Sequence, residues 1–389
     1  MNNFKIKLIK SAFMDENETR RKLADFVMRT EFFSMGEECK KYEEAFAKKQ
    51  ERKFAVFVNS GSSANLILVQ ALLNLGKLKR GDKVGVSAIT WSTNVMPLLQ
   101  LGLVPVAIDC EKESLNVSSS KLEPYLKEIR GLFLTNALGF CHDIKEIRSL
   151  CEEREIVFLE DNCESLGSKA YGRLLGNFGL ASTFSFFLGH HLSTLEGGMV
   201  CTDDEELYHM LLKVRAHGWG RNLPKEKLEA LHKEHGTDPF YALYSFFDLG
   251  YNVRPTEING FLGNLQIQYW DEVVASREKN FKFFNKKKKE NNDLLALSVD
   301  HMDTVSAFAM PIICKDKTTF ESYKNKFTEN GVEIRPIVSG DITSQPFYKK
   351  YINSHGDCPN ARFVHQNGFY FGNTSELNEG ELGILYSLI

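Results

Sequence analysis

Three short stretches of the chain carry residue types that could do chemistry. Residues 59–65 read Asn-Ser-Gly-Ser-Ser-Ala-Asn and join an apolar run to a helical pattern. Glycine lets the backbone approach a ligand closely, serine hydroxyls donate hydrogen bonds, and the first turn of a helix offers free N–H groups to an anion. Gly61, Ser62 and Ser63 therefore form a candidate phosphate site. A capped strand-to-helix turn explains the same residues equally well.

Two carboxylates, Asp161 and Glu164, follow the apolar run at 155–160. They would lie at the carboxyl end of a buried parallel strand, which is where open α/β sheets bind their ligands. A carboxylate at that place can pair with a cationic ring nitrogen, and Asp161 is the candidate for this role. Acidic residues at strand ends also cap helices, so this alternative stays open.

Two adjacent histidines, His190 and His191, come shortly after the run at 182–186. A neutral imidazole, with an ordinary pKa near 6.5, can accept and return a proton close to neutrality. A pair of histidines that belongs to no motif is more often structural than catalytic. The residues alone therefore leave both interpretations open.

The elements that would position these residues alternate in a regular way. Seven short β-branched or aromatic runs are separated by longer helical patterns, and they lie at 54–58, 83–87, 104–109, 131–135, 155–160, 182–186 and 198–202. Near-continuous apolar runs of this kind indicate parallel strands covered on both faces. Helices are expected at 62–74, 92–101 and 143–154, each with a serine or aspartate near its start. The pattern predicts an α/β fold with a mostly parallel sheet.

The chain changes character after residue 221. Residues 221–249 are polar and charged, without a clean apolar face, and we interpret them as a long excursion from the first domain. A long helical stretch then follows Arg254-Pro255 and ends in the lysine run 286–289, which we interpret as a solvated helix end. An α+β pattern with strands near 306–313 and 332–337 completes the chain.

Length and composition set the limits within which these elements must fit. A chain of 389 residues favours two domains, and we predict a large domain over 1–250, including the N-terminal segment, and a small one over 251–389. A net charge of −3 argues against a dedicated nucleic-acid binder. No apolar run reaches the roughly 18 to 20 residues of a membrane span, and the first ten residues lack a signal-like core, so we expect a cytoplasmic protein. The eight cysteines are scattered, which favours reduced core thiols and predicts no metal site.

Together the motifs resemble the fold-type I, pyridoxal-phosphate (PLP)-dependent sugar-nucleotide enzymes of the DegT aminotransferase family. The resemblance rests on the serine-rich turn, on Trp91 after Ala-Ile-Thr, on Asp161, on Phe-Ser-Phe at 184–186 and on Gly-Tyr-Asn-Val-Arg-Pro at 250–255. It runs from Met-Gly-Glu at 35–37 to Phe-Gly-Asn at 371–373. It implies an aspartate aminotransferase-like fold, in which a large domain with a mostly parallel seven-stranded sheet carries a smaller α+β domain.

The resemblance also assigns roles to individual residues. The cofactor phosphate is expected to contact Gly61, Ser62, Ser63 and Ser185. Trp91 is expected against the face of the pyridine ring, Asp161 at its protonated nitrogen and Glu164 near its hydroxyl group. Asn252 is expected to reach the cofactor of a neighbouring subunit, which implies a homodimer. Trp91 as a core residue and Asn252 as a helix cap remain alternatives.

The chain departs from the family's aminotransferases at one position. These enzymes hold the cofactor through a lysine five residues after the serine of Phe-Ser-Phe, and here that residue is His190. Imidazole cannot form the same covalent bond. Histidine is typical of the family's sugar 3-dehydratases, and Glu-Asp-Asn-Cys-Glu-Ser at 160–165 and Arg-Ala-His-Gly-Trp at 215–219 are also similar to the branch that serves the colitose pathway. Another branch with histidine carries an iron–sulfur cluster on clustered cysteines, which this chain lacks.

The resemblance thus implies a PLP- and pyridoxamine phosphate-dependent dehydratase with His190 as its base. The expected reaction removes the C3 hydroxyl from a nucleotide-linked 4-keto-6-deoxysugar, in the first place GDP-4-keto-6-deoxy-D-mannose. It would yield a 3-deoxy-4-ketosugar and ammonia, with glutamate re-aminating the cofactor. Candidates for sugar or diphosphate contacts are His217, Arg221, Arg254 and Arg335. An aminotransferase and a catalytically silent binding relative remain alternatives, and the spacing does not decide which nucleotide or sugar is bound.

Overall fold

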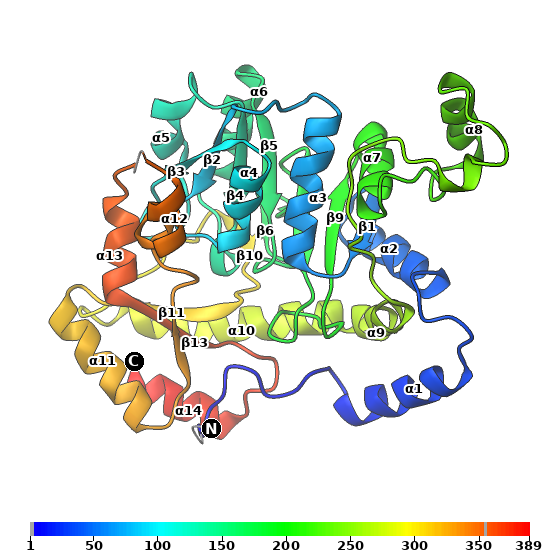
Figure 1. Cartoon of the computed structure of the whole chain (residues 1–389). Helices are drawn as coiled ribbons and strands as arrows, with labels where there is room; N and C mark the ends of the chain where they lie inside the picture. Colours follow the sequence, from blue (N-terminus) through cyan, green and yellow to red (C-terminus); the bar gives the residue numbers. More distant parts are fainter. Residues whose placement is uncertain (1–3, 354–355) are drawn as a thin grey trace.

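The seven apolar runs form one sheet, which occupies the upper half of the molecule in Figure 1. The structure is a computed structural model that describes residues 4–353 and 356–389. The strand order is β1-β9-β8-β5-β4-β2-β3. The strands are β1 (Phe54–Val58), β2 (Lys83–Ser87), β3 (Val104–Ile108), β4 (Gly131–Thr135), β5 (Val157–Asp161), β8 (Ala181–Ser185) and β9 (Gly198–Thr202). The prediction of a mostly parallel seven-stranded sheet is confirmed.

Strand β9 is the exception to the parallel direction, because it pairs antiparallel with both β1 and β8. A parallel neighbour needs a crossover connection that is usually helical. Residues 186–197, which join β8 to β9, contain no helix, so the chain turns back along the sheet. The expectation that the run at 198–202 is a parallel strand is therefore wrong.

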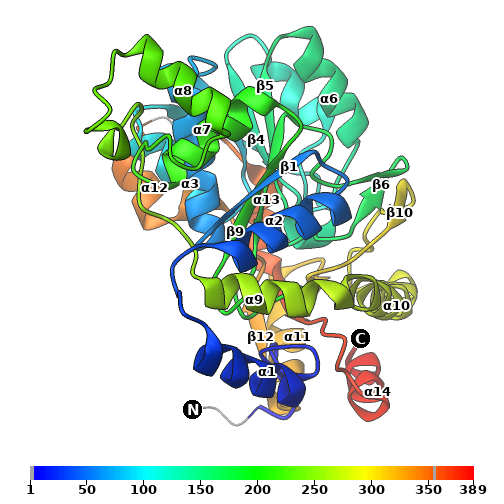
Figure 2. The same cartoon turned by 90° about the vertical axis from the view of Figure 1, so that its right-hand side faces the viewer.

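Helices cover both faces of the sheet, as Figures 1 and 2 show. Side chains alternate along β1, so that Val56 and Val58 enter one core cluster and Ala55 and Phe57 enter another. The first face is covered by α3 (Gly61–Asn74), α4 (Met96–Gln100) and α7 (Glu205–Arg215), and the second by α2 (Glu37–Lys49) and α6 (Ile144–Glu153). Each fully buried phenylalanine of these clusters contributes on the order of 1.5 to 3 kcal/mol through removal of apolar surface from water.

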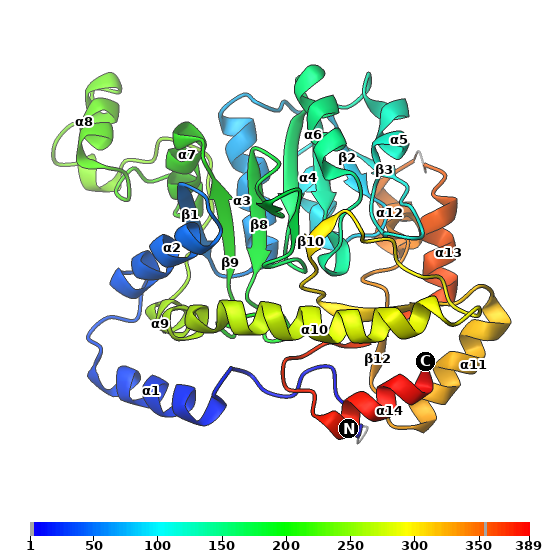
Figure 3. The ribbon, with the colours of Figure 1, turned by 180° about the vertical axis from the view of Figure 1, so that it is seen from behind.

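The C-terminal part begins with two helices, α9 (Glu257–Gln266) and α10 (Trp270–Lys289), and α10 crosses below the sheet in Figure 3. A second sheet follows, with antiparallel order β11-β13-β12. Its strands are β11 (Ala309–Ile313), β12 (Ile334–Pro336) and β13 (Gly368–Gly372), of which β13 was not predicted. The helices around it are α11 (Lys317–Glu329), α12 (Pro346–Tyr351), α13 (Pro359–Asn367) and α14 (Glu379–Leu388).

The remaining elements are short or peripheral. They are α1 (Glu16–Arg29), α5 (Ser119–Leu122), α8 (Lys225–Glu234), the strands β6 (Lys169–Ala170), β7 (Arg173–Leu174) and β10 (Met302–Thr304), and the 3-10 turns η1 (Ser92–Asn94), η2 (Glu123–Tyr125), η3 (Ala137–Gly139), η4 (Ala242–Tyr244), η5 (Ile267–Tyr269) and η6 (Ile342–Ser344). Helix α8 buries none of its residues and projects from the molecule in Figure 1, as expected of the polar segment 221–249. The domain division at residue 250 stays a prediction, and contacts between α2 and α9 and between Ile6 and Val332 cross it.

The lysine run at the end of α10 corrects one interpretation. Lys288 is 1 % exposed, and its Nζ donates a hydrogen bond to the carbonyl oxygen of Pro311 over 3.1 Å. The description of this run as a solvated helix end is therefore wrong for Lys288, because this position faces the small sheet. All eight cysteines are unpaired, and seven of them are buried. Among the helices of the described residues, none is long and apolar enough to cross a membrane.

Candidate active site

A cavity of about 760 Å³ lies at the carboxyl ends of the parallel strands. This is the edge at which open α/β sheets bind their ligands. Residues from five strand ends line it: Ser60, Gly61 and Ser62 after β1, Trp91 after β2, Thr135 of β4, Asp161 of β5 and Ser185 of β8. The opposite wall comes from the C-terminal part, with Arg277, Phe308, Arg335 and Tyr370, and from Leu8 and Ile9 near the N-terminus.

The cavity brings together eight of the predicted site residues. These are Gly61, Ser62, Trp91, Asp161, Glu164, Ser185, His190 and Arg335. Five others do not line it, namely Ser63, Asn252, His217, Arg221 and Arg254. Trp91 is 55 % exposed, so it is no core residue.

The serine-rich turn forms the first turn of α3. The Ser60 hydroxyl caps the helix by accepting the Ser63 N–H over 3.0 Å. A Cβ atom on Gly61 would lie 2.7 Å from the Ser185 Cβ, so only glycine allows this turn to approach the end of β8. The Ser63 hydroxyl donates to the Asn59 Oδ1 over 2.6 Å and does not reach the cavity. The same turn therefore caps α3 and leaves N–H groups free for an anion, with Ser62 lining the cavity.

The Asp161 carboxylate accepts three hydrogen bonds. Its Oδ2 receives the side-chain amides of Asn65 and Asn94 over 3.1 and 2.7 Å, and its Oδ1 receives the Cys163 N–H over 2.9 Å. These donors fix the orientation of a carboxylate that is 4 % exposed and lines the cavity. Such a group can receive the N–H of a protonated ring nitrogen. Asn65 and Asn94 were missed as site residues, although both stand beside motif residues and carry amides that suit an acid.

Glu164 is the second carboxyl group of the cavity. Its Oε2 accepts the Leu138 N–H over 2.8 Å. Burial, with a smaller contribution from the charge of Asp161, raises the pKa of Glu164 from 4.5 to about 7. The two carboxyl groups therefore have different environments, and Glu164 can carry a proton near neutrality.

His190 lies between two aromatic rings, with centroid distances of 6.2 Å to Phe187 and 5.2 Å to Phe308. Its Nδ1 is buried and has no hydrogen-bond partner among the described residues. Burial, aided by the positive charge of Arg277, lowers the pKa of His190 from 6.5 to about 4. A histidine whose pKa is lowered in this way is mainly neutral near pH 7, and its side chain lines the cavity.

The neighbouring His191 has a different environment. Its Nε2 lies 2.9 Å from the Ser306 carbonyl oxygen, and burial lowers its pKa well below 6.5. Arg277 supports the same turn, because its Nη1 donates to the carbonyl oxygens of Ala307 and Phe308 over 3.3 and 2.8 Å. Together these contacts hold Phe308 against the His190 ring. His191 and Arg277 thus support the site, a role that their sequence context does not reveal.

Four of the five predicted residues outside the cavity belong to the segment 217–254. Asn252 is exposed, and its Oδ1 accepts a hydrogen bond from the Arg254 Nε over 2.9 Å. The His217 ring lies 5.1 Å from the Trp219 ring, and the Arg221 guanidinium lies 5.1 Å above that ring. The contact of Asn252 with the cofactor of a neighbouring subunit stays a prediction, as do the sugar or diphosphate contacts of His217, Arg221 and Arg254.

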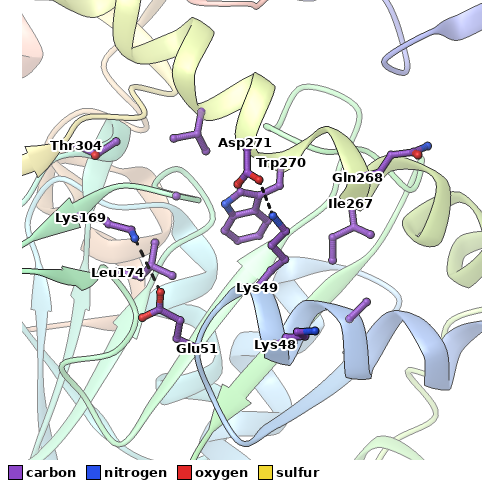
Figure 4. A pocket seen from close by; sticks show the side chains of 13 residues that line it. Lys48, Lys49, Glu51, Lys169, Leu174, Ile267, Gln268, Trp270, Asp271 and Thr304 are labelled. Atoms are coloured by element: carbon purple, nitrogen blue, oxygen red, sulfur yellow. Dashed lines mark hydrogen bonds and ion pairs between the residues drawn. The ribbon is translucent and has the colours of Figure 1, made fainter.

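A second cavity, of about 590 Å³, shares no lining residue with the first (Figure 4). Two of its lysines are paired with carboxylates: Lys49 with Asp271 over 2.8 Å and Lys169 with Glu51 over 3.8 Å. The apolar ring of Trp270 forms part of its wall. None of the predicted site residues lies there, so the chemistry of the chain is concentrated in the first cavity.

Comparison with known proteins agrees with this geometry. The chain matches the DegT/DnrJ/EryC1/StrS aminotransferase family over residues 14–384. It is 37 % identical over 354 residues to a GDP-4-keto-6-deoxy-D-mannose 3-dehydratase of Yersinia pseudotuberculosis, covering 89 % of each chain. It is also similar to a solved GDP-4-keto-6-deoxymannose-3-dehydratase (ColD), a histidine-to-asparagine variant with bound GDP-perosamine. The two share 34 % identity and a TM-score of 0.90, over 99 % of this chain and 100 % of that chain. A structure of the dehydratase with a trapped PLP-glutamate geminal diamine gives 34 % identity and a TM-score of 0.89 over 99 and 100 %. These similarities confirm the predicted fold class.

Proposed function

Because the chain belongs to the DegT/DnrJ/EryC1/StrS aminotransferase family, we propose that it is a PLP-dependent dehydratase that removes the C3 hydroxyl from GDP-4-keto-6-deoxy-D-mannose. The observation that carries this proposal is His190 in the cavity, at the position where the family's aminotransferases are expected to carry a lysine. No lysine is among the described residues that line the cavity. This argues for dehydration over transamination to an aminosugar.

The residues of the cavity fit PLP. The close approach at Gly61 leaves an open helix terminus beside Ser62 and Ser185 for the phosphate. Asp161 would receive the ring N–H, the exposed ring of Trp91 would cover a face of the pyridine, and Glu164 would meet its hydroxyl group. When bound, PLP supplies an electron sink for bond breaking next to a carbonyl-derived carbon.

His190 carries the proton transfers. Its Nε2 accepts a proton as a neutral imidazole and then donates it, as imidazolium, to the departing C3 oxygen. Phe187 and Phe308 flank this ring, and Arg277 holds the backbone of Phe308 beside it. The overall reaction balances: the sugar loses one oxygen atom, while glutamate is oxidised to 2-oxoglutarate and releases ammonia.

The reaction can be tested directly. Purified protein is incubated with PLP, glutamate and GDP-4-keto-6-deoxymannose, and products are measured by mass spectrometry. We expect a nucleotide sugar lighter by one oxygen atom, with equal amounts of ammonia and 2-oxoglutarate. Glutamate nitrogen retained in the sugar would instead indicate an aminotransferase, and unchanged sugar would indicate a binding relative. The CDP-linked ketosugar serves as the control for nucleotide selectivity.

We further propose a homodimer in which Asn252 serves the cofactor of the partner subunit. The side chain of Asn252 is exposed in the single chain, and Ala216, which pairs with it, lies three residues before Trp219, whose ring stacks on the exposed ring of Phe246. Further exposed apolar side chains lie in two segments, Met28 and Phe32 in the first and Phe240, Leu243, Tyr244, Phe246 and Leu249 in the second. Exposed apolar side chains of this kind would be covered by a partner subunit in a two-fold dimer.

Subunit mixing tests the shared site. Asn252→Ala and His190→Asn homodimers are each expected to be poorly active, because each lacks one contribution at both sites. In a mixed dimer, the Asn252→Ala subunit keeps its own His190 and receives Asn252 from its partner. Activity should therefore recover on mixing. No recovery in verified mixed dimers, or a fully active monomer in sedimentation, would contradict the proposal.

A further inference from the structure

A strap near the N-terminus, defined here as residues 5–10, closes one side of the active-site cavity. In Figure 1 it is the dark-blue segment that leads from the N-terminus towards α1. Ile6 pairs with Val332 beside β12, and the Leu8 N–H donates to the Glu333 Oε2 over 3.0 Å. Lys10 Nζ lies 2.7 Å from a Glu381 carboxylate oxygen. The strap is therefore held at both ends by the C-terminal part.

Two glycines allow the strap to lie close to the site. A Cβ atom on Gly372 would lie 3.0 Å from the Leu8 Cα and from its carbonyl oxygen. A Cβ atom on Gly189, the residue before His190, would lie 3.1 Å from the Ile9 Cδ1. Ile9 thus occupies the space that a larger side chain at position 189 would take. It lines the cavity and contacts the backbone next to the proposed base.

We propose that Ile9 is a specificity-determining residue, whose side chain forms with Phe187 and Phe308 an apolar wall that receives the C6 methyl group of the sugar. This inference rests on the proposed function. A 4-keto-6-deoxyhexose has only one apolar substituent, the methyl at C6, which is attached to C5 beside the C4 carbonyl. The C3 hydroxyl is attached on the other side of C4. A base that reaches the C3 oxygen therefore lies within a few bonds of the methyl group, and the apolar wall lies around that base.

The same wall penalises a hydroxymethyl group at C6. The side chains of Ile9, Phe187 and Phe308 offer it no donor or acceptor. Glu333 and Arg335, which lie beside the strap, are already paired with the Leu8 N–H and with each other. A hydroxyl buried without a partner loses its hydrogen bonds to water. A site of this kind discriminates against an added hydroxyl by roughly 10- to 100-fold. Removing the apolar side chain of Ile9 should reduce that discrimination.

Binding of two stable ligands tests the inference without turnover. GDP-mannose and GDP-6-deoxymannose differ by the C6 oxygen, and neither has the 4-keto group. Their dissociation constants are measured by calorimetry on the PLP-loaded protein. We expect the wild type to prefer the 6-deoxy ligand by about tenfold or more. Ile9→Ser should bring the two affinities within about threefold, mainly by tightening the binding of GDP-mannose.

The matched control is Val104→Ser. Val104 is 42 % exposed and Ile9 is 38 % exposed, and both are β-branched. Val104 begins β3 at the amino end of the strand, away from the carboxyl edge where the cavity lies, so this variant should keep the wild-type preference.

The outcomes separate the inference from the proposed function. Equal binding of both ligands by the wild type, or an unchanged preference in Ile9→Ser, overturns the role of Ile9 even if the enzyme dehydrates its substrate. A protein that binds neither ligand and releases no oxygen from the ketosugar overturns the proposed function itself. A preference lost in both Ile9→Ser and Val104→Ser would show a general effect on the fold and would also contradict the inference.

Discussion

Asp161→Asn replaces one carboxylate oxygen by an amide nitrogen at the centre of a small hydrogen-bond network. Asp161 accepts from Asn65 and Asn94 through Oδ2 and from the Cys163 N–H through Oδ1. An amide has only one accepting oxygen. At least one of these donors must therefore face the amide nitrogen of the new asparagine, which is also a donor. The hydrogen bonds that remain then have an uncharged acceptor.

The structure sets the size of the effect. The less costly orientation keeps the oxygen on the two asparagine amides and turns the nitrogen towards the Cys163 N–H. One hydrogen bond to a charged group is then lost and two are weakened, for a total of about 3 kcal/mol in the free energy of unfolding. On the proposed chemistry, losing the partner of the ring nitrogen should slow turnover about 1000-fold, or about 4 kcal/mol in the barrier.

The assay separates stability from chemistry. Urea unfolding gives the loss of stability, calorimetry with PLP gives binding, and oxygen loss from the ketosugar gives turnover. The double variant Asp161→Asn, Asn94→Asp exchanges donor and acceptor across the 2.7 Å contact. It should regain most of the stability but remain nearly inactive, because the carboxylate has moved away from the ring nitrogen. Near-normal turnover of Asp161→Asn would refute the assignment of this residue to the cofactor.

Three further predictions concern His190 and Lys288. His190→Asn should keep ligand binding in calorimetry but lose turnover by about 100- to 10,000-fold. His190→Lys should carry PLP on the chain after borohydride reduction, as seen by peptide mapping. A lysine that bears PLP in the wild type would contradict the role of His190. Burial and Arg277 lower the pKa of His190 to about 4. In the Glu164→Gln variant, kcat/KM should therefore stay level from pH 8 down to about 5 and fall only below that pH. A midpoint near 6.5 would contradict the lowered pKa of His190. Burial lowers the pKa of Lys288 from 10.5 to about 7, so the free energy of unfolding should rise from pH 7 to 10. Lys288→Met should flatten that rise and stabilise the protein at pH 7 by up to about 4 kcal/mol in urea unfolding. An unchanged pH dependence in this variant would contradict the account.

The sheet and the location of the site were predictable because both follow from local patterns. Buried strands appear as continuous apolar runs, and the residues directly after them must lie at one edge if the strands are parallel. Ser62, Trp91, Asp161 and Ser185 therefore meet in one cavity, although they are spread over more than a hundred positions. The direction of β9 was not predictable in this way, since an apolar run carries no information on its direction.

The supporting residues could not be predicted because they depend on contacts between distant segments. Ile9 and Gly189 are ordinary residues in their own surroundings, and only the path of the strap brings them together. Arg277 resembles any charged residue of an amphipathic helix until the turn at 306–308 is packed against it. Lys288 belongs to a run of four lysines, and the angle at which α10 meets the small sheet decides which of them is buried.

The environment of His190 suits an acid more than a strong base. In many sites a carboxylate accepts the Nδ1 proton of a catalytic histidine and makes the ring more basic. Here Nδ1 has no hydrogen-bond partner in the described part of the chain, and burial and Arg277 disfavour the imidazolium by more than the Phe187 backbone favours it. The lone pair is therefore available near neutral pH, and a proton that the ring takes up is readily given away. Expulsion of a hydroxyl group requires that donation, because hydroxide is a poor leaving group. A lowered pKa weakens a histidine that acts only as a base, but it helps one that must also donate a proton to a leaving hydroxyl group. The aromatic neighbours of His190 therefore contribute to the proposed chemistry together with the imidazole.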